Sequence, residues 1–107
     1  VLLAEVLDNL LRNAVEASPD AGAVRVRVDR EGAAARIVVE DEGPGVAEDL
    51  RERIFDPYFS TKPSGTGLGL SIVAQLAGAM GGTVHVDDAA GRGARFVVRF
   101  PVEERRA

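Results

Sequence analysis

Hydrophobic residues recur at helical spacing over the first part of the chain. One apolar stripe consists of Leu3, Leu7, Leu10, Ala14 and Ala17. Polar side chains occupy another face of the same stretch, and a segment with proline and glycine follows at residues 18–22. A stripe with this period is typical of a helix that packs one side against a core. The pattern therefore predicts an amphipathic helix that ends near Ala17.

Further along the chain, alternation with a period of two predicts β-strands, and helical spacing returns once. The predicted elements are strands at 24–29 and 36–40, a helix at 72–80, and a closing hairpin with strands at 84–86 and 95–100. Strands with one apolar face need helices to cover that face. We therefore expect an α+β fold, a two-layer α/β sandwich with helices on one face of a mixed, mostly antiparallel sheet. The residues expected on the other face, toward solvent, are Arg25, Arg27, Arg95 and Arg99.

Composition limits the classes of partner. The chain has 107 residues, the size of one small domain, and no cysteine, so neither a disulfide nor a thiolate metal site is expected. Its net charge of −4 is unfavourable for nucleic acid binding. No apolar run approaches the length of a membrane span, so we expect a cytoplasmic domain without direct membrane contact. The helical pattern begins at Val1 without a cap, which indicates that residues 1–107 are a fragment of a larger protein.

Two asparagines lie four residues apart in the first predicted helix. Asn9 and Asn13 therefore share one helix face, although asparagine is unfavourable inside a helix. Amide oxygens are suitable ligands for Mg²⁺ beside a triphosphate, because they add no negative charge. Taken alone, the pair is more typical of a solvated polar stripe.

An acidic, glycine-rich stretch follows the second predicted strand directly. It reads Asp41-Glu42-Gly43-Pro44-Gly45. A buried carboxylate at a strand end accepts a hydrogen bond from the exocyclic amine of adenine and repels the carbonyl oxygen of guanine. Gly43 and Gly45 allow the backbone to approach a flat base closely. Taken alone, the stretch is more typical of a Gly-Pro turn with a solvated acid.

Glycines also lead into the second predicted helix. The stretch reads Gly65-Thr66-Gly67-Leu68-Gly69-Leu70. Free N–H groups at a helix start favour anions, glycines let phosphate oxygens come close, and Thr66 suits the N-cap position. The spacing differs from that of dinucleotide-binding and Walker loops, which require other residues after the last glycine.

Residues 41–67 form a long connection between the second predicted strand and the second predicted helix. It is irregular apart from a short helical stretch near 49–54. Such connections in small domains usually carry function. Its aromatic residues, within 54–59, predict a lid anchored on the domain, with Lys62 able to reach a phosphate. A local hydrophobic cluster with a surface lysine is the alternative. The Gly91-Arg92-Gly93 stretch is typical of a plain hairpin turn.

Taken in this order, the motifs resemble the catalytic domain of sensor histidine kinases, in the GHKL superfamily of ATPases and kinases. The resemblance covers nearly the whole chain. The corresponding segments are the N box at 9–17, the G1 box at 41–46, the F box at 54–59, the G2 box at 65–70, and the last glycine box at 91–96 with Pro101 after it. The short lid is similar to that of the nitrogen-regulation type of sensor kinase.

The resemblance implies the GHKL ATPase fold and the binding of ATP with Mg²⁺. It implies that Asn13 binds the metal, that Asn9 lies close to the phosphates, and that Asp41 reads adenine. It also implies a catalytic role for Lys62, and a phosphate side formed by Gly65, Gly67 and Gly69 under a lid of about residues 47–64. The other nucleotide-binding residues it implies are Gly43, Gly45, Val46, Tyr58, Thr66, Leu68 and Leu70.

Two features depart from the family pattern. Many members carry a lysine three residues after the metal-binding asparagine, and this chain has Glu16 there. The family fold also has strand structure before the first helix, which this chain lacks. We therefore expect an open sheet edge or an exposed apolar patch.

The reaction implied is transfer of the γ-phosphoryl group of ATP to a histidine on the dimerisation and histidine-phosphotransfer domain of the same protein, with ADP as product. A response regulator receiver domain is the next partner implied. The only histidine, His85, lies in a strand pattern and is expected to be structural, so the chain alone should not phosphorylate itself. The alternatives are an ATP-hydrolysing conformational clamp, whose members carry a glutamate at the position of Asn9, an anti-sigma-type protein-serine kinase, and a degenerate nucleotide-binding module. Whether the larger protein is membrane-anchored is left open.

Overall fold

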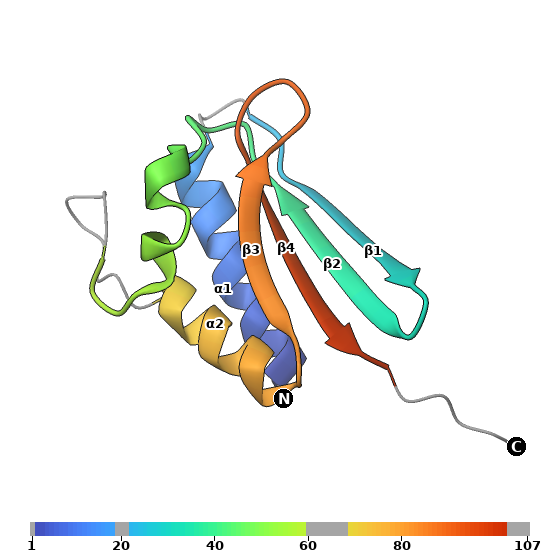
Figure 1. Ribbon diagram of the computed structural model, residues 1–107. Helices are drawn as coiled ribbons and strands as arrows, with labels where there is room; N and C mark the ends of the chain where they lie inside the picture. The colour runs from blue at the N-terminus through green and yellow to red at the C-terminus, as the bar shows by residue number, and fades with distance from the viewer. Residues whose placement is uncertain (1, 19–21, 60–68, 103–107) are drawn as a thin grey trace, which may run out of the picture.

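Two helices lie on one face of a four-stranded sheet (Figure 1). The computed structural model of the chain describes residues 2–18, 22–59 and 69–102. The helices are α1 (Leu2–Ala17) and α2 (Gly69–Ala79), with two short 3-10 helices, η1 (Glu48–Leu50) and η2 (Arg53–Phe55). The strands are β1 (Arg25–Glu31), β2 (Ala34–Glu40), β3 (Thr83–Asp88) and β4 (Ala94–Pro101). This arrangement confirms the predicted α+β sandwich.

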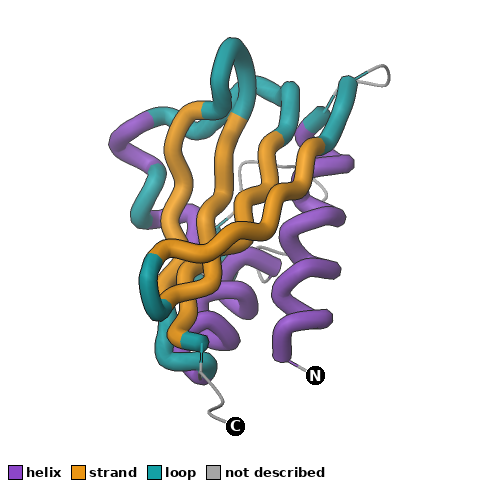
Figure 2. The backbone as a smooth tube through the Cα atoms, turned by 90° about the vertical axis from the view of Figure 1, so that its right-hand side faces the viewer, coloured by secondary structure: helices purple, strands orange, loops and turns teal. Residues whose placement is uncertain are grey.

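The sheet has the strand order β1-β2-β4-β3, and every pairing within the described residues is antiparallel. The tube view shows the twisted sheet in front with both helices behind it (Figure 2). β2 begins at Ala34, two residues before the predicted start, because Ala34 and Ala35 continue the pairing with β1 beyond the turn. The predicted helix near 49–54 forms two separate 3-10 turns instead.

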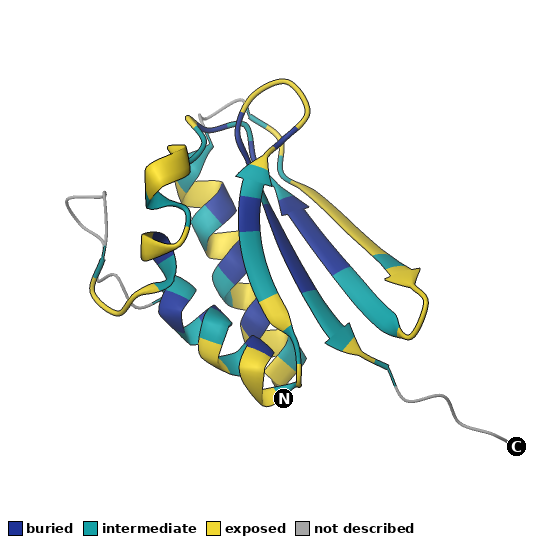
Figure 3. Ribbon diagram, viewed as in Figure 1, coloured by how far each residue is buried: buried dark blue, intermediate teal, exposed yellow. Residues whose placement is uncertain are grey.

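The core lies between the helices and the two central strands. α1 buries Val6, Leu10 and Ala14, which are spaced four residues apart and so face the sheet together. From the sheet, the buried side chains of this cluster include Ile37, Val39, Phe96 and Val98. The burial colours show the dark inner faces of both helices turned toward these strands (Figure 3).

α2 ends at a glycine pair, as predicted. Gly81 has a φ of +78°, which favours glycine, and its N–H donates to the carbonyl of Gly78 at 2.9 Å. The N–H of Gly82 donates to the carbonyl of Ala77 at 2.8 Å, so the last carbonyl groups of the helix are satisfied. The chain then turns directly into β3. Within the described residues, neither helix has the length and apolar character needed to cross a bilayer.

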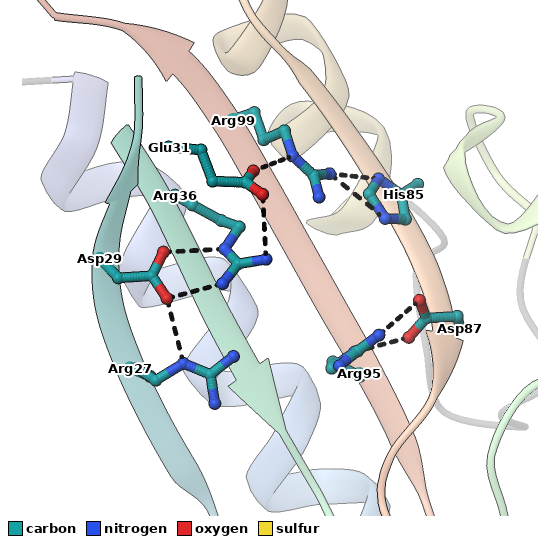
Figure 4. A network of polar contacts seen from close by, with 8 residues as sticks. All are labelled: Arg27, Asp29, Glu31, Arg36, His85, Asp87, Arg95 and Arg99. Carbon is teal, nitrogen blue, oxygen red and sulfur yellow. Dashed lines mark hydrogen bonds and ion pairs between the residues drawn. The ribbon is translucent and has the colours of Figure 1, made fainter. Parts of the chain in front are cut away.

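The other face of the sheet carries a network of ion pairs (Figure 4). Asp29 accepts two hydrogen bonds from Arg36, at 2.8 and 2.7 Å, and Asp87 accepts two from Arg95, at 2.8 and 2.9 Å. Arg99 donates to Glu31 at 3.0 Å. The predicted arginines therefore do lie on this face, but Arg95 and Arg99 are half-buried and paired with acids.

β1 is one of the two outer strands of the described sheet, and its inner face is largely uncovered. Val26 and Val28 alternate with the charged residues of the ion-pair face, yet they are 48% and 66% exposed. Val15 of α1 is also 66% exposed. The expectation of an open edge with an apolar patch agrees with this arrangement.

Candidate functional site

Asp41 stands directly after β2 and is 2% exposed. Its Oδ1 accepts hydrogen bonds from the N–H of Gly43, at 2.9 Å, and from the N–H of Ala94, at 3.1 Å. Its own N–H donates to the carbonyl of Ala94 at 3.0 Å. Within the described residues both bonds to the carboxylate end on Oδ1, so Oδ2 keeps its capacity to accept a further donor. One oxygen of the carboxylate is thus held in place by two backbone N–H groups.

Glycines let three segments meet around Asp41. A Cβ atom on Gly43 would overlap the carbonyl oxygen of Ala17, at the end of α1, and a Cβ atom on Gly93 would overlap the carbonyl oxygen of Asp41 itself. Gly93 also has a φ of +110°. Gly45, with a φ of +78°, faces the carbonyl oxygen of Gly93. These contacts bring together the Asp41 loop (residues 41–47), the end of α1 and the β3–β4 loop (residues 89–93).

A second contact joins the start of α2 to α1. A Cβ atom on Gly69, the first residue of α2, would lie 3.5 Å from Oδ1 of Asn9. The Nδ2 of Asn9 donates to the carbonyl of Glu5, one turn earlier in α1, at 2.9 Å. The amide oxygen of Asn9 is thus turned toward the helix that follows the predicted phosphate loop.

The helix face between these two contacts contains Asn13. Residues 9, 13 and 17 are four apart and share one face of α1, which spans about 12 Å along the axis. Gly69 packs on the Asn9 end of this face, and Gly43 packs on the Ala17 end. Half-buried Asn13 lies between them. One face of α1 therefore connects the Asp41 loop with the start of α2.

The segment that begins the predicted lid is fixed to the body of the domain. Arg51 donates from Nε to the carbonyl of Val46, at 3.2 Å, and forms an ion pair with Asp88 of β3, at 2.9 Å. Phe55 packs edge-on against the buried Phe96, with ring centres 6.2 Å apart. These contacts confirm the anchoring predicted from the aromatic residues, while Arg51 was not foreseen.

The remaining predicted residues are placed as follows. Val46 and Leu70 are half-buried and pack against the core cluster. Tyr58 is 76% exposed and has a φ of +67°, an unfavourable conformation for a bulky residue. The predicted residues that lie outside the described ranges are Lys62, Gly65, Thr66, Gly67 and Leu68.

Two side chains that tie the Asp41 loop to its surroundings were not predicted. Arg92 donates from Nε to the carbonyl of Gly43 at 3.2 Å. Glu42 accepts a hydrogen bond from the N–H of Ala23 at 3.0 Å, and its own N–H donates to Oγ of Ser18 at 3.3 Å. The sequence analysis had taken the stretch around Arg92 only as a hairpin turn, and nothing in the local pattern indicated a contact with Gly43.

His85 lies on the ion-pair face, away from the helices (Figure 4). The guanidinium group of Arg99 is 3.3 Å from its Nδ1. Partial burial lowers the pKa of the His85 imidazole, and the positive charge of Arg99 lowers it further. The ring is thus part of a packed surface, in agreement with the structural role expected for it.

Comparison with known proteins agrees with this geometry. The sequence profile of the family described as "Histidine kinase-, DNA gyrase B-, and HSP90-like ATPase" matches residues 1–104. The sensor histidine kinase ZraS of Escherichia coli O157:H7 is 45% identical over 100 residues, and sporulation kinase A of Bacillus subtilis is 37% identical over 99 residues. These matches cover 94% and 92% of this chain, but only 22% and 16% of the two relatives.

Solved structures show the same fold. The mycobacterial sensor histidine kinase MprB superposes with a TM-score of 0.86 at 35% identity, covering 94% of this chain and 70% of that one. Full-length ShkA, solved in complex with AMPPNP, superposes with a TM-score of 0.83 at 42% identity, covering 94% of this chain and 21% of that one. The chain therefore belongs to the histidine kinase-, DNA gyrase B- and HSP90-like ATPase family, and its sequence and fold are those of the ATP-binding catalytic domain of a sensor histidine kinase.

Proposed function

We propose that this chain binds Mg-ATP and donates the γ-phosphoryl group to a histidine on the dimerisation domain of the same protein. The observation that carries the proposal is the helix face of α1 that joins the Asp41 loop to the start of α2. This face would hold the nucleotide lengthwise, with the base at Asp41 and the phosphates toward Gly69. The receiver domain of a response regulator would then accept the phosphoryl group.

Asp41 would recognise the base. One carboxylate oxygen is already used by the N–H groups of Gly43 and Ala94, so the other has a fixed direction. An acceptor held in this way favours the exocyclic amine of adenine and disfavours the carbonyl oxygen of guanine. Because the residue is 2% exposed, water competes poorly for this hydrogen bond.

The phosphates would lie beside Asn9 and the first turn of α2. A helix start offers free N–H groups and favours negative charge. Gly69 has no side chain to block this approach. Lys62, Gly65, Thr66, Gly67 and Leu68 would complete this side, and they remain proposals from the resemblance.

Mg²⁺ would enter with the nucleotide and be held in part by Asn13. The described residues contain no group of three or more His, Cys, Asp or Glu side chains that could form a metal cage. Mg²⁺ is commonly bound by one or two protein oxygens, the substrate phosphates and water, so a neutral amide oxygen fits this chemistry. The bound ion would neutralise charge on the β- and γ-phosphates.

In the transfer step, a nitrogen of the acceptor imidazole forms a bond to the γ-phosphorus, the bond to the β–γ bridging oxygen breaks, and ADP leaves. Such transfer depends mainly on positioning and charge neutralisation. The chain's own residues would hold the base, orient the phosphates and, through the anchored segment 48–55, cover the nucleotide. His85 is on the opposite face of the sheet and would not be the acceptor.

The clamp-type ATPase remains the second candidate, and one position separates the two. A hydrolytic clamp needs a general base one turn before the metal-binding asparagine. This chain has Asn9 there, and its amide is engaged with the carbonyl of Glu5. Neutral amides do not accept a proton from water near pH 7, so we expect ATP hydrolysis to be slow.

The proposal is tested by mixing the chain with γ-labelled ATP, Mg²⁺ and the dimerisation domain of the same protein. We expect label on the dimerisation domain that is stable in alkali and lost in acid, as phosphohistidine is. No stable label should appear on the chain alone. The control is a dimerisation domain with its acceptor histidine replaced by glutamine, and label that persists on it would contradict the proposal. Rapid release of phosphate without transfer would favour the clamp.

A further inference from the structure

We propose that Arg92 is a positioning residue that sets the selectivity of the base pocket by holding the Asp41 loop. This inference rests on the proposed recognition of adenine by Asp41. Arg92 lies in the β3–β4 loop, between two glycines, and is 49 residues from Gly43 in the sequence. Its Nε donates to the carbonyl of Gly43 at 3.2 Å.

The contact between Arg92 and Gly43 is linked to the carboxylate of Asp41 through a single residue, Gly43. Arg92 binds the carbonyl oxygen of Gly43, and the N–H of the same residue donates to Oδ1 of Asp41 at 2.9 Å. Ala94, two residues after Arg92, donates to the same Oδ1 at 3.1 Å. Asp41 is thus held twice from this part of the chain, directly by Ala94 at the start of β4 and indirectly through Arg92 of the β3–β4 loop and Gly43.

Glu42 ties the Asp41 loop to another part of the chain. Its carboxylate accepts the N–H of Ala23 at 3.0 Å and pairs with Arg25 at 3.4 Å, so it fixes the loop to the start of β1. With Arg92 removed, the loop would be free to tilt toward β1 about this tether. The tilt would change the direction of the Asp41 carboxylate and weaken only those hydrogen bonds that depend on it.

Arg92 contributes little to the core. Its side chain is exposed and lines an open hollow of about 370 Å³ together with Arg25 and Glu42. Replacing it therefore creates no buried cavity. An effect of Arg92 on nucleotide selectivity would for this reason reflect the contact with Gly43.

The chain contains a matched control. Arg30 donates from Nε to the carbonyl of Gly32, at 2.9 Å, in the β1–β2 turn. The chemistry is the same as between Arg92 and Gly43, but the turn lies at the other end of β2 from Asp41. Arg30→Met and Arg92→Met each remove a hydrogen bond from an arginine Nε to a glycine carbonyl, and of the two only Arg92 touches the Asp41 loop.

The test compares the binding of ATP and inosine triphosphate, which carries a carbonyl oxygen where adenine has its amine. Titration calorimetry on the 107-residue chain gives the ratio of the two affinities. We expect Arg92→Met to lower the preference for ATP by roughly three- to tenfold, the effect of losing one hydrogen bond, with the affinity for inosine triphosphate unchanged. Arg30→Met should leave the ratio as in the wild type.

A second measurement needs no nucleotide. Exchange of the Gly43 amide hydrogen should be roughly three- to tenfold faster in Arg92→Met, because its hydrogen bond to Asp41 opens more often. An unchanged ratio, or an equal loss for both nucleotides, would overturn the inference. A wild-type chain that does not prefer ATP would instead refute base recognition by Asp41, and the exchange measurement would still report whether Arg92 holds Gly43.

Discussion

At the scale of single residues, Asp41 combines a structural and a recognition role in one carboxylate. Oδ1 accepts two backbone N–H groups, and the side chain is almost fully buried. An asparagine at this position keeps an oxygen for those two bonds but replaces the other oxygen with a donor. The substitution therefore separates recognition from folding.

We expect Asp41→Asn to weaken ATP binding by about tenfold or more, because a hydrogen bond to a charged acceptor is lost and two donors then face each other. The affinity is measured by titration calorimetry, with circular dichroism to show that the fold is kept. Asp49→Asn, at an exposed carboxylate in η1, is the control and should bind normally. Equal affinities of Asp41→Asn and the wild type would contradict the proposed base recognition.

At the scale of elements, the site depends on backbones that approach more closely than side chains allow. The end of α1 touches the Asp41 loop at Gly43, where a Cβ atom would overlap the carbonyl oxygen of Ala17. The partner atom belongs to the backbone, so it cannot rotate away. By contrast, Gly78 in the last turn of α2 has no atom within 4 Å of the place where a Cβ would stand.

We expect opposite effects of alanine at these two glycines. Gly43→Ala should lower the free energy of unfolding by about 1–3 kcal/mol through overpacking and shift the Asp41 loop, which also weakens ATP binding. Gly78→Ala should raise it by about 0.5–1 kcal/mol, because alanine loses less backbone entropy in a helix. Urea denaturation followed by circular dichroism measures both. An unchanged free energy of unfolding in Gly43→Ala would mean that α1 and the Asp41 loop can separate without loss of stability.

At the scale of the whole molecule, the uncovered face of the sheet is stabilised by charges that titrate. Hydrogen bonds from Arg36 lower the pKa of Asp29 from 3.8 to about 2, and those from Arg95 lower the pKa of Asp87. Burial and Arg99 lower the pKa of His85 below 6.5. All three groups bind protons more readily in the unfolded chain, so each makes the fold less stable as the pH falls.

The melting temperature should therefore fall in two stages on acidification. The contribution of His85 is fully present above pH 6.5 and is lost as the pH falls through the lower pKa of the folded chain. The contribution of Asp29 is lost later, between about pH 4 and pH 2. We expect His85→Gln to remove the first stage and leave the second, as measured by melting curves at closely spaced pH values. A first stage of unchanged size in His85→Gln would assign it to another group.

Much of this architecture follows from local patterns. The helical spacing of Leu3, Leu7, Leu10, Ala14 and Ala17 predicted an apolar face of α1, because the period of a helix fixes which residues share a face. The structure fully buries Leu10 and Ala14 of this stripe, together with Val6. The same rule predicted that Asn9 and Asn13 lie together. Asp41 was predicted at a strand end, and it is buried there as proposed.

Other features depend on which segments meet. The alternation of Val26 and Val28 predicted a strand, but their exposure was decided by the position of α1, which does not cover the outer strand. The contact of Arg92 with Gly43, and the approach of Gly69 to Asn9, join residues far apart in the sequence. Periodicity carries no information about such pairs.

The sequence by itself determined most of the elements, their apolar faces and the residue types at the nucleotide-binding motifs, because these follow from local backbone geometry and side-chain chemistry. Only the tertiary structure decided that Gly43 and Gly69 pack on two ends of one α1 face, with Asn13 between them. It also decided that Ala94, at the start of β4, donates to the carboxylate of Asp41 and that Arg92 of the β3–β4 loop binds Gly43. The physical reason is that these contacts arise when the sheet and helices pack as layers, and packing is set by the whole core at once.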